Sequence, residues 1–477
     1  MPVNRRAKIV CTLGPATASP ERVRGLVDAG MDVARLNFSH GTQADHEQVY
    51  ALVREAAQAA GRAVGVLADL QGPKIRLGRF ADSPVEWRTG DTVVITSDDI
   101  VGTRERVSCT YRKLPAEVRT GDRLLIDDGR VAVEVKTVLG GTDIQCLVIE
   151  GGQVSNHKGV SLPNVAISVP ALSEKDADDL RFALRLGADM VALSFVRSPD
   201  DIKLVHQVMD EVGIRRPVIA KIEKPEAVAA LDEIVDRFDA IMVARGDLGV
   251  EMPLDEVPLV QKRAVQLGRE LAKPVIVATQ MLDSMIENSR PTRAEASDVA
   301  NAVLDGADAV MLSGETSVGR YPVLTVSTMA RIVETTECGS LAVPRLQHDP
   351  RTHGGALTVA AANIAQAINA RALVAFSQTG DTVRRLARLH CQLPLIACTP
   401  EVAVRNQLSL SWGVQTLLVP FVHHTDEMFQ QVDRTLTETG AAAPGDYVVI
   451  VAGSPPGTPG STNTLRVHQL GSLLDTH

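Results

Sequence analysis

The sequence predicts an α/β protein in which a (β/α)8 TIM barrel carries an inserted, β-barrel-like domain and is followed by a C-terminal α/β domain. Three observations support this fold class. Eight short apolar runs alternate with helical patterns, a long segment of different character interrupts them, and a second alternating pattern begins after residue 340. The length of 477 residues is enough for roughly three domains.

Apolar runs rich in β-branched residues provide the strands of the predicted barrel. Amphipathic helical patterns, such as 21–30 and 173–187, lie between several of them. Continuous apolar strands that alternate with helices indicate a parallel sheet covered by helices, and eight strands are the number that closes a barrel. The runs span 8–14, 33–40, 63–70, 189–196, 217–223, 240–247, 274–281 and 309–316.

A weak internal repeat supports the barrel and indicates where functional side chains lie. The pattern Gly-x-Asp-x-x-x-Leu-(Asn/Ser) occurs at 30–37, 187–194 and 306–313. The Gly suits the end of a helix, because it reaches the left-handed cap conformation at little cost. Each repeat then places a polar residue at the carboxyl end of a strand, which is where barrel enzymes have their active sites.

Two further segments depart from the barrel pattern. The runs 91–99, 122–130, 131–138 and 143–152 are short strands separated by Gly and Asp turns, which predicts an inserted β domain. The runs 372–380, 393–400, 414–420 and 447–455 predict another α/β domain. We therefore expect a barrel over 1–71 and 169–340, an inserted domain over 72–168, and a C-terminal domain over 341–477.

Composition and charge exclude several classes of function. The net charge of −9 argues against nucleic acid and anionic membranes as partners, because phosphate electrostatics dominate such binding. No run has the length of a signal peptide or a membrane helix, and the six cysteines are scattered, which indicates reduced thiols and a cytoplasmic location. The whole acidic excess lies in residues 169–340.

The best candidate for chemistry lies at two consecutive strand ends. Lys221 and Glu223 are two residues apart on one predicted strand and therefore point to the same face, and Asp247 follows the next strand. Two carboxylates from neighbouring strands suit Mg²⁺, which takes one or two protein oxygens and leaves its other positions to substrate and water. The alternative is a solvated Lys–Glu pair with an unrelated Asp in a turn.

Other polar residues are expected at the same rim. Arg35 lies in an otherwise apolar strand, so it needs an anionic partner, either an internal Asp or a bound anion. Lys74 and Arg76 lie at the hinge into the inserted domain, over the predicted mouth of the barrel. The remaining rim residues could equally be turn caps, and they are Asn37, Ser39, His40, Asp69, Thr279 and Ser313.

Several long strings together resemble the pyruvate kinase family. KIVCTLGPAT (8–17), MDVARLNFSHG (31–41), ADLQGPKIRLG (68–78), KIEKPEA (221–227) and IMVARGDLGVE (241–251) stand in order. ATQMLDSMIENSRPTRAEASDVANAVLDGADAVMLSGETSVGRYP (278–322) follows, and the resemblance extends to STNTLRV (461–467). It implies Mg²⁺-dependent phosphoryl transfer from phosphoenolpyruvate to ADP, giving pyruvate and ATP, with the inserted domain as a lid that excludes water.

The resemblance implies a role for each matching position. Glu223 and Asp247 would hold Mg²⁺ or Mn²⁺, Lys221 would stabilise the transferring phosphoryl group and the enolate, and Arg35 would bind the substrate phosphate. The backbone of Ala244, Arg245 and Gly246, with Thr279, would hold the substrate carboxylate. Thr279 and Ser313, with water, would lie where the enolate is protonated. The implied nucleotide contacts are Asn37, Ser39, His40, Arg76 and Lys158.

Two departures from the family pattern affect the expected ligands. Many members need K⁺, held by groups that match Asn37, Ser39, Asp69 and the carbonyl of Leu70, and they carry Glu where this chain has Lys74. The segment here resembles the K⁺-independent branch, so we expect the Lys74 ammonium to make K⁺ dispensable although the pocket residues survive. The second departure is His157 beside Lys158, where the family often has two lysines.

The C-terminal domain resembles the family's regulatory domain. A hydroxyl-rich turn precedes a helix there, which suits a phosphate, and we expect a sugar-phosphate or nucleotide effector at Ser377, Thr379, Gly380, Thr382 and Gly460. Asp381 opposes an anion, and simple helix capping explains the same hydroxyls. The family resemblance also implies a homotetramer. The rival interpretations are a Mg²⁺-dependent lyase or aldolase of phosphoenolpyruvate or pyruvate chemistry, and a non-catalytic sensor.

Overall fold

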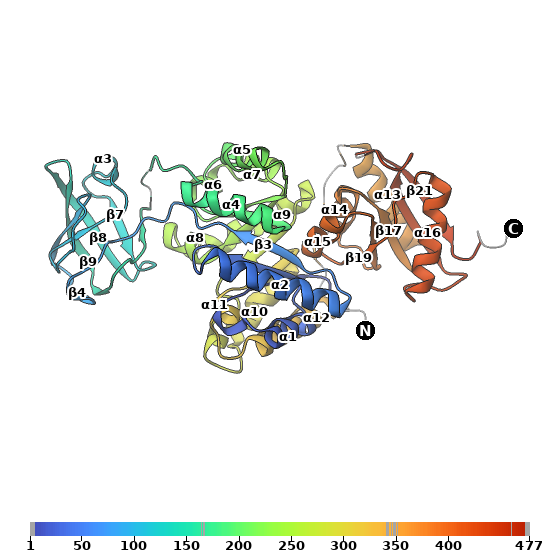
Figure 1. Cartoon of the computed structure of the whole chain (residues 1–477), viewed down its shortest axis with the longest axis horizontal. Helices are drawn as coiled ribbons and strands as arrows, with labels where there is room; N and C mark the ends of the chain where they lie inside the picture. The colour runs from blue at the N-terminus through green and yellow to red at the C-terminus, as the bar shows by residue number, and fades with distance from the viewer. Residues whose placement is uncertain are drawn as a thin grey trace.

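Three bodies lie in a row along the molecule (Figure 1). The computed structural model describes residues 5–163, 165, 167–339, 343–344, 346, 350, 352–458 and 460–472. The inserted domain is at the left, the barrel is in the centre and the C-terminal α/β domain is at the right of the view. The expected boundary between residues 340 and 341 lies outside the described residues.

The central body is a closed barrel of eight strands, as predicted. Neighbouring strands are parallel all the way round, and they follow the order β1-β16-β15-β14-β13-β12-β3-β2. Each of the eight apolar runs contains one strand. Their bounds are β1 Lys8–Thr12, β2 Val33–Asn37, β3 Gly65–Asp69, β12 Met190–Leu193, β13 Val218–Ile222, β14 Ala240–Ala244, β15 Val275–Ala278 and β16 Ala309–Leu312.

Helices cover the outside of this barrel. Four of the longer ones begin at a Ser or Thr whose side chain accepts a backbone N–H of the first turn, and these caps are Ser19, Thr42, Ser173 and Thr292. The helix bounds are α1 Pro20–Ala29, α2 Gln43–Ala60, α4 Glu174–Leu186, α5 Ile202–Val212, α6 Pro225–Ala229, α7 Leu231–Arg237, α8 Arg245–Glu251, α9 Val257–Leu271, α10 Arg293–Asp305, α11 Gly314–Ser317 and α12 Pro322–Cys338.

The inserted domain leaves the barrel after β3 and returns before α4. It contains a two-stranded sheet, β10-β4, and a six-stranded sheet in the order β11-β7-β8-β9-β5-β6. Its own apolar cluster includes Trp87, Ile95 and Leu124, all buried. The bounds are β4 Val85–Trp87, β5 Thr92–Thr96, β6 Arg106–Ser108, α3 Leu114–Glu117, β7 Arg123–Ile126, β8 Val131–Leu139, β9 Asp143–Glu150, β10 Gly152–Val154 and β11 Val160–Ser161.

The C-terminal domain is a five-stranded sheet in the order β19-β18-β17-β20-β21, with β21 antiparallel to β20. In the described part of the chain, no helix has both the length and the apolar character that crossing a membrane requires. The bounds are α13 His353–Ala367, β17 Ala372–Phe376, α14 Asp381–Ala387, β18 Leu395–Thr399, α15 Val402–Gln407, β19 Val414–Leu418, α16 Thr425–Glu438, β20 Tyr447–Gly453 and β21 Thr462–Gln469.

The Asp residues of the internal repeat link neighbouring strands at the end of the barrel opposite its polar rim. Each of the three carboxylates accepts the backbone N–H of a residue at the start of a neighbouring strand: Asp32 from Ile9 (2.9 Å), Asp189 from Val66 (2.7 Å) and Asp308 from Val275 (3.0 Å). Two of them also hold the C-terminal domain, because Asn406 donates to Asp189 and the Trp412 backbone N–H donates to Asp308. The repeat therefore supports both strand register and domain contact.

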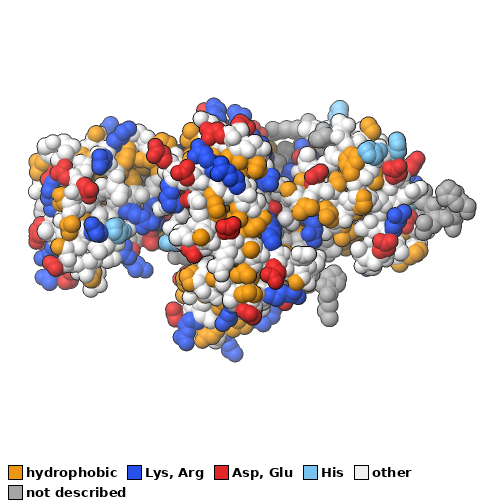
Figure 2. All heavy atoms as spheres, viewed as in Figure 1, with side chains coloured by type: hydrophobic (Ala, Val, Ile, Leu, Met, Phe, Trp, Pro, Cys, Tyr) orange, Lys and Arg blue, Asp and Glu red, His pale blue; other side chains and the backbone are white. Residues whose placement is uncertain are grey.

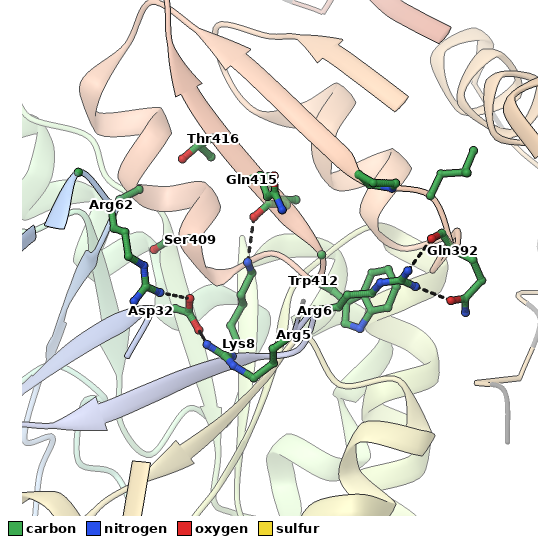
Figure 3. Close-up of a pocket in the computed structure, with 16 residues that line it drawn as sticks. Arg5, Arg6, Lys8, Asp32, Arg62, Gln392, Ser409, Trp412, Gln415 and Thr416 are labelled. Carbon is green, nitrogen blue, oxygen red and sulfur yellow. Dashed lines mark hydrogen bonds and ion pairs between the residues drawn. The ribbon is translucent and has the colours of Figure 1, made fainter. Parts of the chain in front are cut away.

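A cleft of about 340 Å³ lies between this end of the barrel and the C-terminal domain. Figure 3 shows Arg5 and Arg62 converging on Asp32, at 2.7 and 3.3 Å. Lys8 donates to the Val414 carbonyl oxygen at 2.9 Å. Lys8, the first residue of β1, thus contacts the first residue of β19.

We expect Asp308 to make stability pH-dependent. Burial raises the pKa of Asp308 from 3.8 to about 6, and its two backbone N–H donors and the Arg269 charge only partly oppose this. Between these values the folded state binds more protons than the unfolded state. Stability therefore falls as the pH rises from about 4 to 6, by roughly 3 kcal/mol at 1.36 kcal/mol per pKa unit.

Thermal unfolding of wild type and Asp308→Asn between pH 4 and 7 measures this effect. The difference between the two melting temperatures should change across the interval, because the variant lacks the titrating group. Asp32→Asn is the matched control, since burial opposes ionisation of Asp32 but the Arg5 and Lys8 charges lower its pKa, which moves its titration below this interval. A constant difference for Asp308→Asn would contradict the prediction.

Candidate active site

The candidate residues come from six strands whose carboxyl ends share one rim. β2 ends at Asn37, β3 ends at Asp69, and β13 carries Lys221 with Glu223 immediately after it. Asp247 lies in α8, which begins directly after β14, and Thr279 and Ser313 follow β15 and β16. Because the barrel is closed and parallel, these positions face one opening, toward the inserted domain (Figure 1).

Lys221 is the centre of a buried network. Its Nζ lies 2.7 Å from Glu223 Oε1 and 3.5 Å from Asp69 Oδ1, and it donates to Ser194 Oγ at 2.8 Å. Lys221 is 8% exposed, and both carboxylates are 1% exposed. The structure therefore supports the functional interpretation of the Lys-x-Glu pair over a solvated pair.

The positive and negative charges in this network stabilise one another's ionised forms. Burial alone would lower the pKa of Lys221, but the negative charges of Asp69 and Glu223 outweigh it and raise that pKa. Burial opposes ionisation of Asp69, yet the Lys221 and Arg35 charges lower its pKa. Lys221 consequently stays protonated at neutral pH and provides a fixed positive charge at the rim.

Arg35 has the internal Asp partner that the sequence left as one of two possibilities. Its Nε donates to Asp69 Oδ2 at 2.6 Å, and its Nη1 donates to Thr12 Oγ1 at 2.9 Å. A guanidinium has five N–H donors, so these two contacts do not exhaust it. The same side chain can be held by Asp69 and still bind an anion in the barrel mouth.

The carboxylates of Glu223 and Asp247 fit a divalent cation. Burial raises the pKa of Glu223, Lys221 opposes this rise, and the nearby charge of Asp247 adds to it. Phe195 donates its backbone N–H to Glu223 Oε2 at 2.8 Å, whereas Oε1 has no hydrogen-bond donor despite its proximity to Lys221. A cation between the two carboxylates would offset their repulsion and satisfy this buried oxygen.

The described residues contain no group of three or more His, Cys, Asp or Glu side chains that could hold a metal.

The turn after β14 presents its backbone, not its Arg side chain, to the rim. The Arg245 guanidinium points away and binds both carboxylate oxygens of Asp298 at 2.7 Å. Gly246 donates its N–H to Thr279 Oγ1 at 2.7 Å, and a Cβ at Gly246 would come within 3.2 Å of that oxygen. Thr279 has a φ of +70°, a strained conformation for a β-branched residue that places its hydroxyl against this turn.

The start of α11 is held by Glu315. The Ser313 backbone N–H donates to Glu315 Oε2 at 2.7 Å, and Leu282 donates its N–H to Oε1 at 3.2 Å. Glu315 is 1% exposed, so it joins the loops that follow β15 and β16. These loops carry Thr279 and Ser313, whose relative position Glu315 therefore fixes.

The expected nucleotide contacts are only partly brought together. Asn37 accepts the Ser39 N–H at 3.2 Å, and Asn37 pairs in register with Asp69 of β3. Burial and the charges of Arg76, Lys74 and Arg35 lower the pKa of His40.

Lys158 lies on the inserted domain and is not free in this structure. It binds Asp127 Oδ1 at 2.8 Å, which the sequence did not indicate. Arg76 donates to the His157 carbonyl oxygen at 3.0 Å. In Figure 2, Lys and Arg side chains gather along the side of the inserted domain that faces the barrel.

The expected effector residues surround a small pocket in the C-terminal domain. Ser377, Thr379, Thr382 and Gly460 contribute to its wall. Gly380 has a φ of +80° and donates its N–H to Ser377 Oγ at 2.9 Å, while Thr382 Oγ1 contacts Thr462 Oγ1 at 2.6 Å. Pro459 of the same loop lies outside the described residues.

Sequence reasoning assigned no role to four residues that organise the site: Thr12, Ser194, Phe195 and Glu315. The repeat gave one usable signal, because it places Ser194 at the position equivalent to Asn37 and Ser313. The backbone contact of Phe195, at a φ of +54°, has no counterpart in that pattern.

Comparison with known proteins gives one consistent result. Residues 4–326 match the family model "Pyruvate kinase, barrel domain", and residues 355–468 match "Pyruvate kinase, alpha/beta domain". The chain is 64% identical to a pyruvate kinase of Mycobacterium intracellulare, over 98% of this chain and 99% of that protein. It is 65% identical to one of Corynebacterium efficiens, over 98% of each.

A solved structure shows the same likeness in three dimensions. The crystal structure of a pyruvate kinase from Cryptosporidium parvum superposes with a TM-score of 0.89 at 36% sequence identity. The match covers 98% of this chain and 96% of that one, so it includes all three bodies.

Proposed function

The chain belongs to the pyruvate kinase family, and from that premise we propose how its own residues carry the family's reaction, the transfer of a phosphoryl group from phosphoenolpyruvate to ADP. The products are pyruvate and ATP. The observation that carries the assignment of residues is the buried contact of 2.7 Å between Lys221 and Glu223 at the barrel rim. A lyase or aldolase, and a non-catalytic sensor, have no support from these likenesses.

The family generally uses Mg²⁺ and K⁺. Glu223 and Asp247 would hold Mg²⁺, or Mn²⁺, which when bound supplies positive charge to the oxygens of phosphoenolpyruvate. Glu223 is already oriented for this by the Phe195 N–H. Asp247 is only partly buried, at the start of α8, so it faces the opening of the barrel.

Arg35 and Lys221 act on the phosphoryl group. Arg35 binds the substrate phosphate through the N–H groups that Asp69 and Thr12 leave free. An oxygen of the ADP β-phosphate forms a bond to phosphorus while the bond from phosphorus to the enol oxygen breaks, and that oxygen keeps the electron pair. Lys221 lies where this charge develops, and positioned charge of this kind is the main requirement of phosphoryl transfer.

The turn after β14 and the Thr279 hydroxyl act on the rest of the substrate. The backbone N–H groups around Ala244, Arg245 and Gly246 bind its carboxylate, and the Gly246 N–H leaves Thr279 Oγ1 to do so. Thr279 and Ser313, with water, deliver a proton to the methylene carbon of the enolate. That step forms the methyl group of pyruvate and restores the ketone.

The nucleotide is held between the barrel and the inserted domain. Asn37, Ser39 and His40 approach it from the barrel, and Arg76 and Lys158 approach it from the hinge and the inserted domain. Lys158 must leave Asp127 to do so, at a small cost because the Lys158 side chain is 32% exposed. Closure of this domain as a lid would exclude water during transfer.

We expect Lys74 to make K⁺ dispensable. Lys74 follows the end of β3 by five residues and is close in the chain to Asp69 and Leu70, which with Asn37 and Ser39 would form the pocket. A fixed ammonium can replace a monovalent cation electrostatically. Activity with K⁺ exchanged for tetramethylammonium should stay within about threefold of its value in K⁺. Such a ratio corresponds to a change in activation free energy close to RT.

The matched variant is Lys74→Glu, which restores the residue common in K⁺-dependent members. Its activity should fall at least about tenfold without K⁺ and recover when K⁺ is added, corresponding to about 1.4 kcal/mol. Collapse of wild-type activity in tetramethylammonium would show that Lys74 does not replace the ion.

We further propose a regulatory ligand, a homotetramer and a cytoplasmic location. The hydroxyls of Ser377, Thr379 and Thr382 line one pocket with Gly460, which suits a sugar phosphate or a nucleotide. Asp381 is partly neutralised by Arg385 at 2.7 Å. Pyruvate formation measured with sugar phosphates and AMP tests the site, and an unchanged response in Thr382→Val would exclude it.

The test of the overall assignment is ADP-dependent pyruvate formation from phosphoenolpyruvate, followed in a coupled assay. Pyruvate should appear in proportion to the ATP formed. Pyruvate formed without ADP would contradict the proposal.

A further inference from the structure

Ser194 occupies an unusual position beside the proposed catalytic Lys221. It follows β12 directly, and its side chain is inside the barrel rim, with 1% of the residue exposed. Among the described residues, its Oγ forms hydrogen bonds with two groups: Lys221 Nζ at 2.8 Å and the Leu70 carbonyl oxygen at 2.7 Å. Strand β12 lies between β3, which leads to Leu70, and β13, which carries Lys221.

The direction of both hydrogen bonds follows from chemistry. A carbonyl oxygen can only accept, so the Ser194 hydroxyl donates its single proton to Leu70. A lysine ammonium can only donate, so it uses a lone pair of the same hydroxyl. The hydroxyl thus has one arrangement, in which the backbone of Leu70 orients Ser194 and Ser194 orients Lys221.

The other neighbours of Lys221 are both anionic. Glu223 Oε1 and Asp69 Oδ1 lie 2.7 and 3.5 Å from Nζ. Each attracts the ammonium toward its own side and reduces the charge that a substrate phosphoryl group would meet. Ser194 is the one neutral acceptor recorded for Nζ among the described residues, and a neutral acceptor fixes position without cancelling charge.

We propose that Ser194 is a positioning residue that holds the Lys221 ammonium in line with the transferring phosphoryl group. The inference rests on the proposed role of Lys221. Without the hydroxyl, the ammonium is left between two carboxylates and moves toward them. Its charge is then misplaced relative to the transition state, whereas Arg35 and the 244–246 turn still bind the substrate.

The packing around Ser194 limits the variants that can test it. A Cβ at Gly72 would come within 2.9 Å of Ser194 Cβ and within 2.7 Å of the Phe195 ring. The backbone at Gly72 therefore packs closely against Ser194 and Phe195. Ser194→Ala removes the hydroxyl and adds no atom. Ser194→Cys keeps a side chain of similar shape with a much weaker hydrogen-bonding group.

The expected result is a separation of kcat from KM. In Ser194→Ala, kcat should fall about 10²-fold, the effect of a misplacement near 1 Å, while KM for phosphoenolpyruvate stays within about threefold. Ser194→Cys should behave like Ser194→Ala. Ser409→Ala is the matched control, because Ser409 is also buried and bridges two backbone groups, but at the opposite end of the barrel.

The control should lose comparable thermal stability and keep its kcat. Equal kcat losses in Ser194→Ala and Ser409→Ala, or an unchanged kcat in Ser194→Ala, would overturn the proposal. Full recovery of kcat in Ser194→Cys would show that packing alone matters.

A double variant separates this inference from the role of Lys221. If Ser194 acts through Lys221, Ser194→Ala should cause little further loss in a Lys221→Met background. A full 10²-fold further loss would assign Ser194 a different action. Retained activity in Lys221→Met alone would instead refute the role of Lys221, whatever Ser194→Ala does.

Discussion

Lys221→Met should lower kcat by about 10³-fold, a loss of about 4 kcal/mol of transition-state stabilisation. The ammonium is the buried positive charge nearest the proposed metal ligands, and its contact with Glu223 is 2.7 Å. Methionine has a similar length and no charge, so it removes the electrostatic contribution and leaves much of the volume. KM for phosphoenolpyruvate should change far less, because Arg35 and the 244–246 turn remain.

The variant also leaves two buried carboxylates without one of their cations. Asp69 keeps Arg35, at 2.6 Å, whereas Glu223 loses the one basic partner that it has among the described residues. The melting temperature should therefore be measured beside kcat. Lys203→Met is the matched control, since Lys203 is an exposed helical lysine that pairs with Asp200 at 2.8 Å. Near-wild-type kcat in a folded Lys221→Met protein would refute the proposed role.

Glu223→Gln should weaken divalent-cation binding and lower kcat/KM by about 10²-fold or more. The substitution keeps the shape of the side chain and can still accept the Phe195 N–H, but it removes the negative charge that a cation requires. Binding of Mn²⁺ to the protein without substrates, measured by its paramagnetic signal, provides a readout independent of activity. Raising Mg²⁺ in the assay should recover part of the lost activity.

The control for this variant is Glu226→Gln, three residues along the chain. Glu226 is exposed in the first turn of α6. Its substitution by Gln is the same chemical change at a position outside the rim. Its Mn²⁺ affinity and kcat/KM should match wild type. Equal Mn²⁺ affinity in Glu223→Gln and Glu226→Gln would show that Glu223 is not a ligand.

The fold was predictable because each barrel strand is a mainly apolar run. A strand buried on both faces has no alternation of polar residues, so its limits are visible in the sequence, as in 217–223 and 240–247. The repeat was also informative, because Asn37, Ser194 and Ser313 lie at strand ends as expected. Its Asp residues fasten neighbouring strands at the far end of the barrel.

The contacts of individual side chains were less predictable. The sequence could not choose between Asp69 and a bound anion as the partner of Arg35, because both satisfy a buried guanidinium. It could not show that Arg245 turns outward to Asp298, since the residue after a strand can face either way. The proposed role of Ser194 depends on contacts among β3, β12 and β13, and the inserted domain separates β3 from β12 in the sequence.

The pairing of the first barrel strand with the last has a consequence for synthesis on the ribosome. Lys8 of β1 is in register with Ala309 of β16, so β1 gains its second neighbour only after roughly 300 further residues have been made. At 5–20 residues per second this takes about 15–60 s. Throughout that time the nascent chain exposes an apolar strand edge, so the period before closure is when aggregation competes most strongly with folding and when protection by a chaperone would matter most.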